Sequence, residues 1–197
     1  MHTLIISGGT IDTDFALDLL KKEKYDHIIG VDGALKFCKE QNIVPTRIVG
    51  DFDTLDPEIL TWYQTHTQIE IRQFNPVKDA TDTQIAIELA MELGSRKITL
   101  VGGTGTRLDH VLGNIQTLYL PFAKGIDCRI VDAHNRIRLV SGELHLKMTE
   151  QWGKYVSLIP FTTDVEGVDL IGFKYSLEKF SFTVLGTGSR GVSNEIA

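Results

Sequence analysis

Short apolar runs alternate with amphipathic stretches along the first two thirds of the chain. The apolar runs are rich in Ile and Val, which is typical of strands buried on both faces of a sheet. They occupy residues Thr3–Ser7, His27–Val31, Arg47–Val49, Ile69–Gln73, Lys97–Val101 and Asp127–Val131. The stretches between them predict helices at Asp14–Lys22, Gly33–Gln41, Pro57–Thr65, Asp82–Leu93 and Asp109–Tyr119. This alternation predicts an α/β fold with a mainly parallel sheet and helices on both faces.

Two of the predicted helices carry clear local signals. Thr81 and Gln84 have the spacing of a capping box at the start of the fourth helix, and Gly94 is a natural stop at its end. The fifth helix carries an apolar stripe at helical spacing, formed by Leu108, Leu112, Ile115 and Tyr119.

The pattern changes near His134, where helical periodicity disappears. Short segments that alternate in places between apolar and polar residues predict strands at Arg136–Val140, Glu143–Met148, Tyr155–Pro160, Asp164–Leu170 and Lys179–Val184. Glycines separate these segments, so we expect a small antiparallel β domain. The chain is therefore expected to form two domains, residues 1–132 and residues 133–197.

Composition narrows the classes of function. The 197 residues carry a formal net charge of −6, whereas nucleic-acid-binding domains usually present a basic face or stripe. No apolar run approaches the length of a membrane span, and the first residues do not have the pattern of a signal peptide. Cys38 and Cys128 lie far apart and match no metal-binding spacing. We expect a cytoplasmic protein that binds neither nucleic acid nor membrane.

Two carboxylates follow the third predicted strand. Asp51 and Asp53 are separated by one residue, and side chains at this spacing on an extended segment point to the same side. Carboxylates so placed repel each other unless a cation or hydrogen bonds lie between them. The pattern therefore favours a magnesium site, which needs only a few carboxylates beside its waters. The alternative is an acidic surface turn that caps the next helix.

A second cluster lies at the start of the fourth predicted helix. Asp79 and Asp82 are placed where acidic side chains complement the helix dipole. Lys78 precedes them and can reach a phosphate while a neighbouring carboxylate reaches a metal ion. Without a ligand, both carboxylates are simply favourable residues of a helix N-terminus.

The loop Gly102–His110 is the most specific of the three clusters. A Gly/Thr-rich turn leads here from a strand into a helix, and helix N-termini attract phosphate. Arg107 can bind phosphate with two parallel hydrogen bonds, and Asp109 can add a metal ligand. The loop lacks the ending of a Walker motif and the third glycine of a dinucleotide-binding loop. The alternative is that Asp109 is an N-cap and Arg107 is its surface partner.

Another polar segment lies near the end of the chain. Gly186–Glu195 contains many small hydrogen-bonding residues. It is either a flexible turn or part of a pocket for a polar heterocycle.

Taken in this order, the motifs resemble those of the thiamine pyrophosphokinase (thiamine diphosphokinase) family. The resemblance covers nearly the whole chain and rests on Val31–Ala34, Gly50–Asp53, Lys78–Asp82, Gly102–His110 followed by Asn114 and Ile115, and Ser193–Glu195. It implies an α/β nucleotide domain followed by a small antiparallel β-sandwich. It also implies a homodimer whose active sites lie between the α/β domain of one subunit and the β domain of the other.

The resemblance also implies a reaction, the transfer of pyrophosphate from ATP to the hydroxyl of thiamine with Mg²⁺ as cofactor and AMP as product. The implied magnesium ligands are Asp51, Asp53 and Asp82, and Asp109 is an implied catalytic residue close to the metal or substrate. The implied ATP contacts are Asp32, Lys78, Thr81, Gln84 and Arg107. Ser193 and Asn194 are implied thiamine contacts that one subunit donates to the other.

Three departures from the family pattern are visible. Ala34 and Thr106 stand where Gly is common, and Thr54 stands where Ser is usual. Two other functions stay open, a nucleotide-sugar transferase that uses Asp51 and Asp53 as its metal motif and a non-catalytic sensor of nucleotide or thiamine. Formation of AMP from ATP, with and without thiamine, distinguishes all three.

Overall fold

The computed structural model divides the chain into two compact units, Met1–Leu139 and Val140–Ala197. It describes residues 1–53, 55–74, 80–185 and 187–197.

The first unit is built on a seven-stranded sheet with the strand order β4-β3-β2-β1-β5-β6-β7. The strands are β1 (His2–Ile6), β2 (His27–Val31), β3 (Arg47–Gly50), β4 (Glu70–Gln73), β5 (Lys97–Val101), β6 (Asp127–Val131) and β7 (Arg136–Arg138). All neighbours from β4 to β6 are parallel, and β7 pairs antiparallel with β6. The predicted mainly parallel sheet is therefore confirmed.

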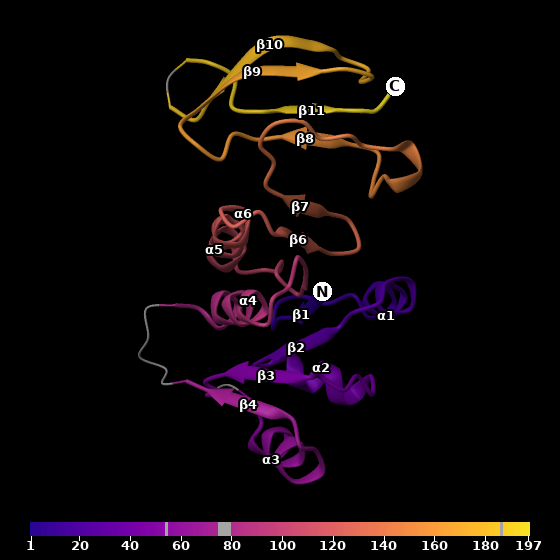
Figure 1. Cartoon of the computed structure of the whole chain (residues 1–197), viewed down its shortest axis with the longest axis vertical. Coiled ribbons are helices and arrows are strands. Elements are labelled where there is room, and N and C mark those ends of the chain that lie inside the picture. Colours follow the sequence, from indigo (N-terminus) through magenta and orange to yellow (C-terminus); the bar gives the residue numbers. More distant parts are fainter. Residues whose placement is uncertain (54, 75–79, 186) are drawn as a thin grey trace. The chain divides into compact units, whose positions relative to one another are not determined.

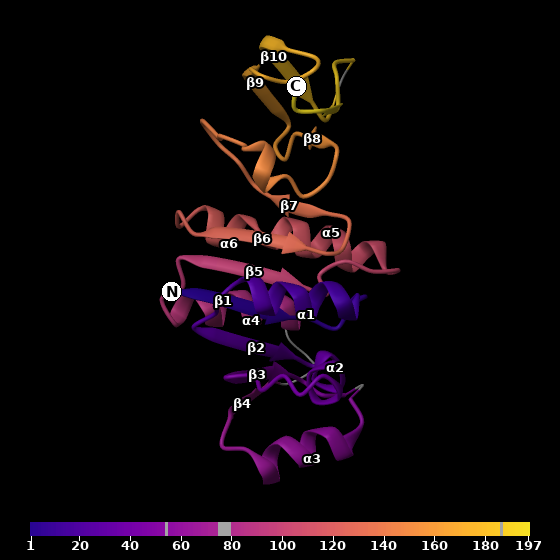
Figure 2. The same cartoon turned by 90° about the vertical axis from the view of Figure 1, so that its right-hand side faces the viewer.

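Helices cover both faces of this sheet. They are α1 (Thr13–Lys22), α2 (Ala34–Glu40), α3 (Pro57–His66), α4 (Asp82–Glu92), α5 (Leu108–Thr117) and α6 (Tyr119–Phe122). Figure 1 shows α4, α5 and α6 on one face and α1 and α2 on the other, and Figure 2 shows α1 in front of the strands after a quarter turn. Within the described residues, no helix has the length and apolar character needed to cross a membrane.

The core of the first unit lies between the central strands and α4. Ile5, Ile29 and Leu100 on the strands and Ile87 on the helix are fully buried. Burying a side chain of this size contributes roughly 1.5–3 kcal/mol. Because both faces of the central strands are covered, their sequences are almost wholly apolar, which explains why they were predictable.

The edge strand β4 has no buried residue and takes part in several ion pairs. Arg47 and Arg72 contact Glu70 at 3.0 and 3.1 Å, and Arg72 also contacts Glu92 at 2.9 Å. Charged side chains on an edge strand discourage pairing with another chain.

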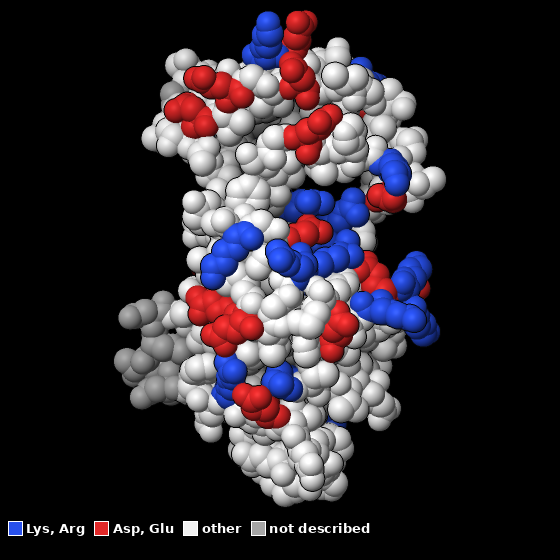
Figure 3. Space-filling model, in the orientation of Figure 1, with Lys and Arg blue, Asp and Glu red and all other residues white. Residues whose placement is uncertain are grey.

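On the face drawn in Figure 3, Lys and Arg are interspersed with Asp and Glu.

The second unit contains two small antiparallel sheets. Strand β9 (Asp164–Leu170) pairs with β10 (Leu177–Thr183), and β8 (Val156–Leu158) pairs with β11 (Val192–Asn194). A short 3-10 turn, Met148–Glu150, precedes them. The predicted small antiparallel β domain is confirmed. Strand β11 lies in the polar segment near the end of the chain, for which the sequence left a flexible turn and part of a pocket as alternatives.

The boundary between the units differs from the expected one. The sequence places it between residues 132 and 133, whereas the compact units meet at Leu139 and Val140. The physical reason is that Arg136–Arg138 hydrogen-bonds to β6 and extends the first sheet, although its alternating pattern is also typical of the β domain.

Two further expectations were wrong in detail. Glu143–Met148 alternates like a strand but is not assigned to one, and Leu144 and Met148 are exposed. The apolar stripe of the fifth helix is mostly exposed, since Leu108, Leu112 and Tyr119 are 55–72 % exposed and, of the four residues, Ile115 packs against the core. A strand needs a partner and an apolar stripe needs a covering surface, and a single sequence shows neither.

Candidate active site

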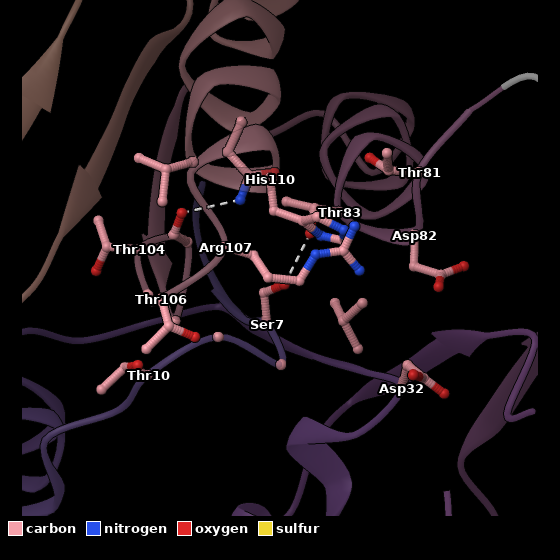
Figure 4. Close-up of a pocket in the computed structure, with 18 of the residues that line it drawn as sticks. Ser7, Thr10, Asp32, Thr81, Asp82, Thr83, Thr104, Thr106, Arg107 and His110 are labelled. Carbon is pink, nitrogen blue, oxygen red and sulfur yellow. Dashed lines mark hydrogen bonds between the residues drawn. The ribbon is translucent and has the colours of Figure 1, made fainter. Parts of the chain in front are cut away.

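A pocket lies where the order of the strands reverses. The chain runs outward from β1 to β4 and then returns to place β5 beside β1, which leaves a crevice at the carboxyl ends of these strands. A pocket of about 590 Å³ occupies this position, lined by segments 7–10, 80–83 and 102–107, and by Val31, Asp32, Asp51, His110, Val111 and Asn114. Figure 4 shows Asp32 and Asp82 on one side of it and Thr10, Thr104 and Thr106 on the other.

Two glycine-rich loops meet at the floor of the pocket. The loop after β1 donates backbone hydrogen bonds to the loop after β5, from Gly9 N to Gly102 O at 2.9 Å and from Thr10 N to Thr104 O at 2.8 Å. Asn114 on α5 is buried and donates from Nδ2 to Gly103 O at 2.9 Å. The two loops are thereby held as one rigid surface.

Only glycine fits at the contact between these loops. A Cβ atom on Gly9 would lie 2.3 Å from Thr104 O, and one on Gly102 would lie 2.1 Å from Ser7 O. Gly102 also has a φ of +72°, which side chains disfavour. The missing side chains leave backbone exposed to the pocket, which is what close binding of a phosphate requires.

Three carboxylates converge beside this pocket. Asp32, Asp51 and Asp53 each offer an oxygen atom, and these oxygens lie within 4.8 Å of one another. Asp32 follows β2 and the other two follow β3, so parallel strands bring the three to the same edge of the sheet.

Left-handed backbone turns create this convergence. Asp32 has a φ of +43° and Phe52 has a φ of +61°. The segment 51–53 is therefore not the extended one expected from the sequence, although it still directs both carboxylates to one place. The turn at Phe52 costs roughly 1–2 kcal/mol. Its ring is buried against Leu35 and Ile48, which contributes roughly 1.5–3 kcal/mol and offsets that cost.

The three carboxylates fit a hard divalent cation. They supply oxygen donors only, which Mg²⁺ prefers, and they leave room for waters and for a ligand. The family resemblance implies Asp82 as a metal ligand and Asp32 as an ATP contact, whereas the structure places Asp32 in the group of three carboxylates. Among the described residues, Asp82 lines the same pocket but is not a member of the group.

The first turn of α4 forms one wall of the pocket. Thr81 caps the helix by accepting from Gln84 N at 3.2 Å, and Asp82 follows in the first turn. The hydroxyl groups of Thr83 and Ser7 are buried and 2.7 Å apart, which joins α4 to the end of β1 (Figure 4). The start of α4 is therefore fixed relative to the glycine loops.

Arg107 lines the pocket and is held by Asp109. The guanidinium donates to both carboxylate oxygens, from Nη2 to Oδ2 at 2.7 Å and from Nε to Oδ1 at 3.3 Å. The hydrogen bond from Arg107 lowers the pKa of Asp109 to about 2. Asp109 lies in the first turn of α5 and is not its N-cap, and the structure does not place it in the carboxylate group.

Comparison with known families covers both units of the chain. One protein-family model, described as "Thiamin pyrophosphokinase, catalytic domain", matches residues 16–130. A second family model, described as "Thiamin pyrophosphokinase, vitamin B1 binding domain", matches residues 142–197. The chain belongs to the thiamine pyrophosphokinase family. The resemblance proposed from the sequence is thereby confirmed, and the chain is an enzyme of the transferase kind that this family comprises.

Individual relatives agree with the family assignment. The thiamine pyrophosphokinase of Bacillus subtilis strain 168 is 34% identical over 174 residues, which cover 85% of this chain and 77% of the relative. The crystal structures of thiamin pyrophosphokinases from Geobacillus thermodenitrificans and Bacillus subtilis are each 31% identical to this chain and superpose with a TM-score of 0.83. Each match covers the whole of this chain, and 88% and 90% of the respective structures.

The three other implied ATP contacts, Thr81, Gln84 and Lys78, do not all lie in the pocket that the structure describes. Thr81 lines the pocket, whereas Gln84 does not, and the side chain of Gln84 donates to Glu88 at 2.9 Å. Only the Thr81 half of the predicted capping box is therefore formed. Lys78 lies outside the described residues, so its role as an ATP contact stays a prediction.

The two implied thiamine contacts both lie on β11 in the second unit. Ser193 is exposed, whereas Asn194 is 2 % exposed and its amide is occupied. Asn194 Oδ1 accepts from Tyr175 N at 3.1 Å, and its Nδ2 donates to Tyr175 O at 2.6 Å. In this structure Asn194 therefore holds the neighbouring turn, and Ser193 is the one of the two that presents its side chain outward.

The sequence interpretation overlooked the loop at residues 7–10. A signal was available, because Gly8-Gly9-Thr10 after β1 repeats the Gly102-Gly103-Thr104 after β5. Both copies follow strands at the point where the sheet reverses, and both line the pocket.

Proposed function

We propose that this member of the thiamine pyrophosphokinase family transfers pyrophosphate from ATP to the hydroxyl of thiamine, in the presence of Mg²⁺. The products are thiamine diphosphate and AMP. The observation that supports this reaction best is one pocket lined by two glycine loops and by Asp32 and Asp51, which form a cluster of three carboxylates with Asp53. The match of the second unit to a vitamin B1 binding domain supports thiamine as the acceptor.

In this proposal the carboxylates hold the cation and the loops hold the nucleotide. Asp32, Asp51 and Asp53 would bind Mg²⁺, with Asp82 beside them as a further candidate. The bound ion would neutralise negative charge on the phosphate oxygens. Backbone N–H groups at the start of α4 and in the glycine loops favour an anion at the same place.

The reaction itself needs positioning more than a strong nucleophile. The oxygen of the thiamine hydroxyl attacks the β-phosphorus of ATP and loses its proton to solvent. The bond from the β-phosphorus to the bridging oxygen of the α-phosphate breaks, and AMP leaves with that oxygen. Arg107 lies in the pocket and offers a fixed positive charge that stabilises the charge developing on the leaving group. Asp109 is a weak base, because its ion pair with Arg107 lowers its pKa to about 2. Its role here is to orient Arg107.

AMP release tests the reaction directly. With ATP, Mg²⁺ and thiamine, we expect AMP and thiamine diphosphate in equal amounts, measured by anion-exchange chromatography. With thiamine omitted, AMP formation should fall to background. Binding of ATP without AMP release would indicate a sensor, and activity with a sugar nucleotide alone would indicate a sugar transferase. Either result contradicts the proposal.

We further propose that the chain works as a homodimer with active sites shared between subunits. Among the described residues of the second unit, only Pro160, Leu170, Phe182 and Asn194 are buried. Large apolar side chains, including Ile159, Ile171, Tyr175 and Leu185, are 60–89 % exposed. So small a core beside so much exposed apolar surface is typical of a unit that is covered by a partner.

Light scattering tests the assembly. A dimer is expected near 44 kDa, twice the 22.0 kDa of the chain. A monomeric mass at the protein concentration where AMP is released would contradict a site completed by a second subunit.

A further inference from the structure

We infer that Asp132 is a positioning residue for the nucleotide, acting through the hydroxyl of Thr104. Asp132 does not line the pocket, and none of the sequence motifs includes it. Thr104 lines the pocket and donates from Oγ1 to Asp132 Oδ2 at 2.9 Å. The two residues come from different strand ends, since Thr104 follows β5 and Asp132 follows β6. The inference rests on the proposed function.

The other oxygen of Asp132 shapes the turn in which it lies. Oδ1 accepts from the backbone N–H groups of His134 and Asn135, both at 2.7 Å, and the turn closes with Asp132 N donating to Asn135 O at 3.0 Å. Burial alone would raise the pKa of Asp132, but the N–H of His134, the hydroxyl of Thr104 and the side chain of Asn135 lower it below its ordinary value. These hydrogen bonds therefore favour the ionised carboxylate and hold it in place beside Thr104.

The hydrogen bond to Thr104 does something that the turn does not need. The turn is closed by the local bonds to Oδ1 and by a further bond from Asn135 Nδ2 to Oδ2 at 3.2 Å. The bond from Thr104 to Oδ2 reaches instead a loop 28 residues earlier in the chain. That loop is already held by Asn114 from one side and by Thr10 N from another. Asp132 supplies a third attachment, through the side chain of Thr104.

Three attachments fix where the backbone N–H groups of this loop point. A pre-organised loop binds an anion without first paying the entropy of ordering it. Loss of one charge-assisted hydrogen bond should therefore weaken nucleotide binding by about five- to tenfold. The KM for ATP should change and the KM for thiamine should not, because the glycine loops hold the nucleotide in the proposed function.

Substitutions of Thr104 and Asp132 test this arrangement in the full-length enzyme. T104V and D132A should each raise KM for ATP by about five- to tenfold, with KM for thiamine within about twofold of the wild type. T104S keeps the hydroxyl and should retain the wild-type KM. The double variant should be no worse than the more affected single variant, because both changes remove the same bond. T117V is the matched control, since Thr117 donates its hydroxyl only to Gly113 O within α5.

Two measurements keep this test separate from the proposed reaction. Calorimetry gives the affinity for ATP and Mg²⁺ directly, and thermal unfolding reports whether each variant is folded. A wild-type protein that releases no AMP overturns the proposed reaction. A folded T104V that binds ATP like the wild type, or effects that multiply in the double variant, overturn the role of Asp132.

Discussion

Replacing Asp51 by Asn is expected to lower turnover at least about 100-fold, on the scale of removing a main electrostatic stabiliser of a transition state. Asp51 lies in the pocket and belongs to the group of three carboxylates. Asparagine keeps the shape and one oxygen but removes the charge that a divalent cation requires. The same loss is expected for D53N. It is also expected for D32N, which the structure, unlike the sequence, places in this group.

The matched control for these variants is D56N. Asp56 lies in the same segment and caps α3 by accepting from Glu58 N at 2.9 Å, and Asn serves equally well at such a position. It removes the same charge without touching the pocket, so turnover should stay within about twofold of the wild type. Initial rates of AMP release across a magnesium titration measure the effect. Near wild-type turnover in both D51N and D32N would contradict a metal-binding role for the group.

The sequence predicted the strands of the first unit well because strands buried on both faces appear in the sequence as continuous apolar runs. β2, β5 and β6 have the predicted bounds, and all three lie inside the sheet with apolar residues on both faces. The strands of the second unit have a weaker apolar pattern. These strands are half-exposed, and Glu143–Met148 alternates without forming a strand. Alternation states which face is apolar, but a strand also needs hydrogen bonds from a neighbour.

The acidic motifs predicted the edge of the sheet but not the grouping of side chains there. The position of Asp32 depends on its own left-handed φ and on pairing between β2 and β3, which no local pattern encodes. The grouping of Asp51 and Asp53 depends on the left-handed turn at Phe52, which is stabilised by packing against α2 and β3. Tertiary contacts therefore decide which carboxylates come together, and the sequence could predict only the edge of the sheet at which they lie.

The same limit explains the roles of Asp109 and Asn194. Both stand at positions that match family motifs, and both side chains have partners within their own unit. Asp109 holds Arg107 toward the pocket, and Asn194 holds the turn at Tyr175 beside Ser193. A motif indicates that a residue belongs to the site, but only geometry separates a side chain that touches the ligand from one that orients its neighbour.

Replacing Gly9 by Ala is expected to damage both folding and activity. The added Cβ would lie 2.3 Å from Thr104 O and 2.4 Å from Gly102 O, and both atoms belong to the backbone. No rotamer relieves such a contact, so the two loops must separate and the bond from Gly9 N to Gly102 O is lost. We expect the free energy of unfolding to fall by about 2 kcal/mol or more, and kcat/KM for ATP to fall at least about 100-fold.

Two other glycines serve as controls that show whether this effect comes from the contact between the loops. A Cβ on Gly8 would meet nothing closer than 3.9 Å, so G8A should change the free energy of unfolding by less than about 1 kcal/mol. Gly113 lies in α5 with open space around it, and G113A should leave activity unchanged while stabilising the helix by about 0.5–1 kcal/mol. Chemical denaturation and AMP release measure all three variants. If G9A matched G8A in stability and G113A in activity, the two loops would not form the rigid floor on which the proposed nucleotide site depends.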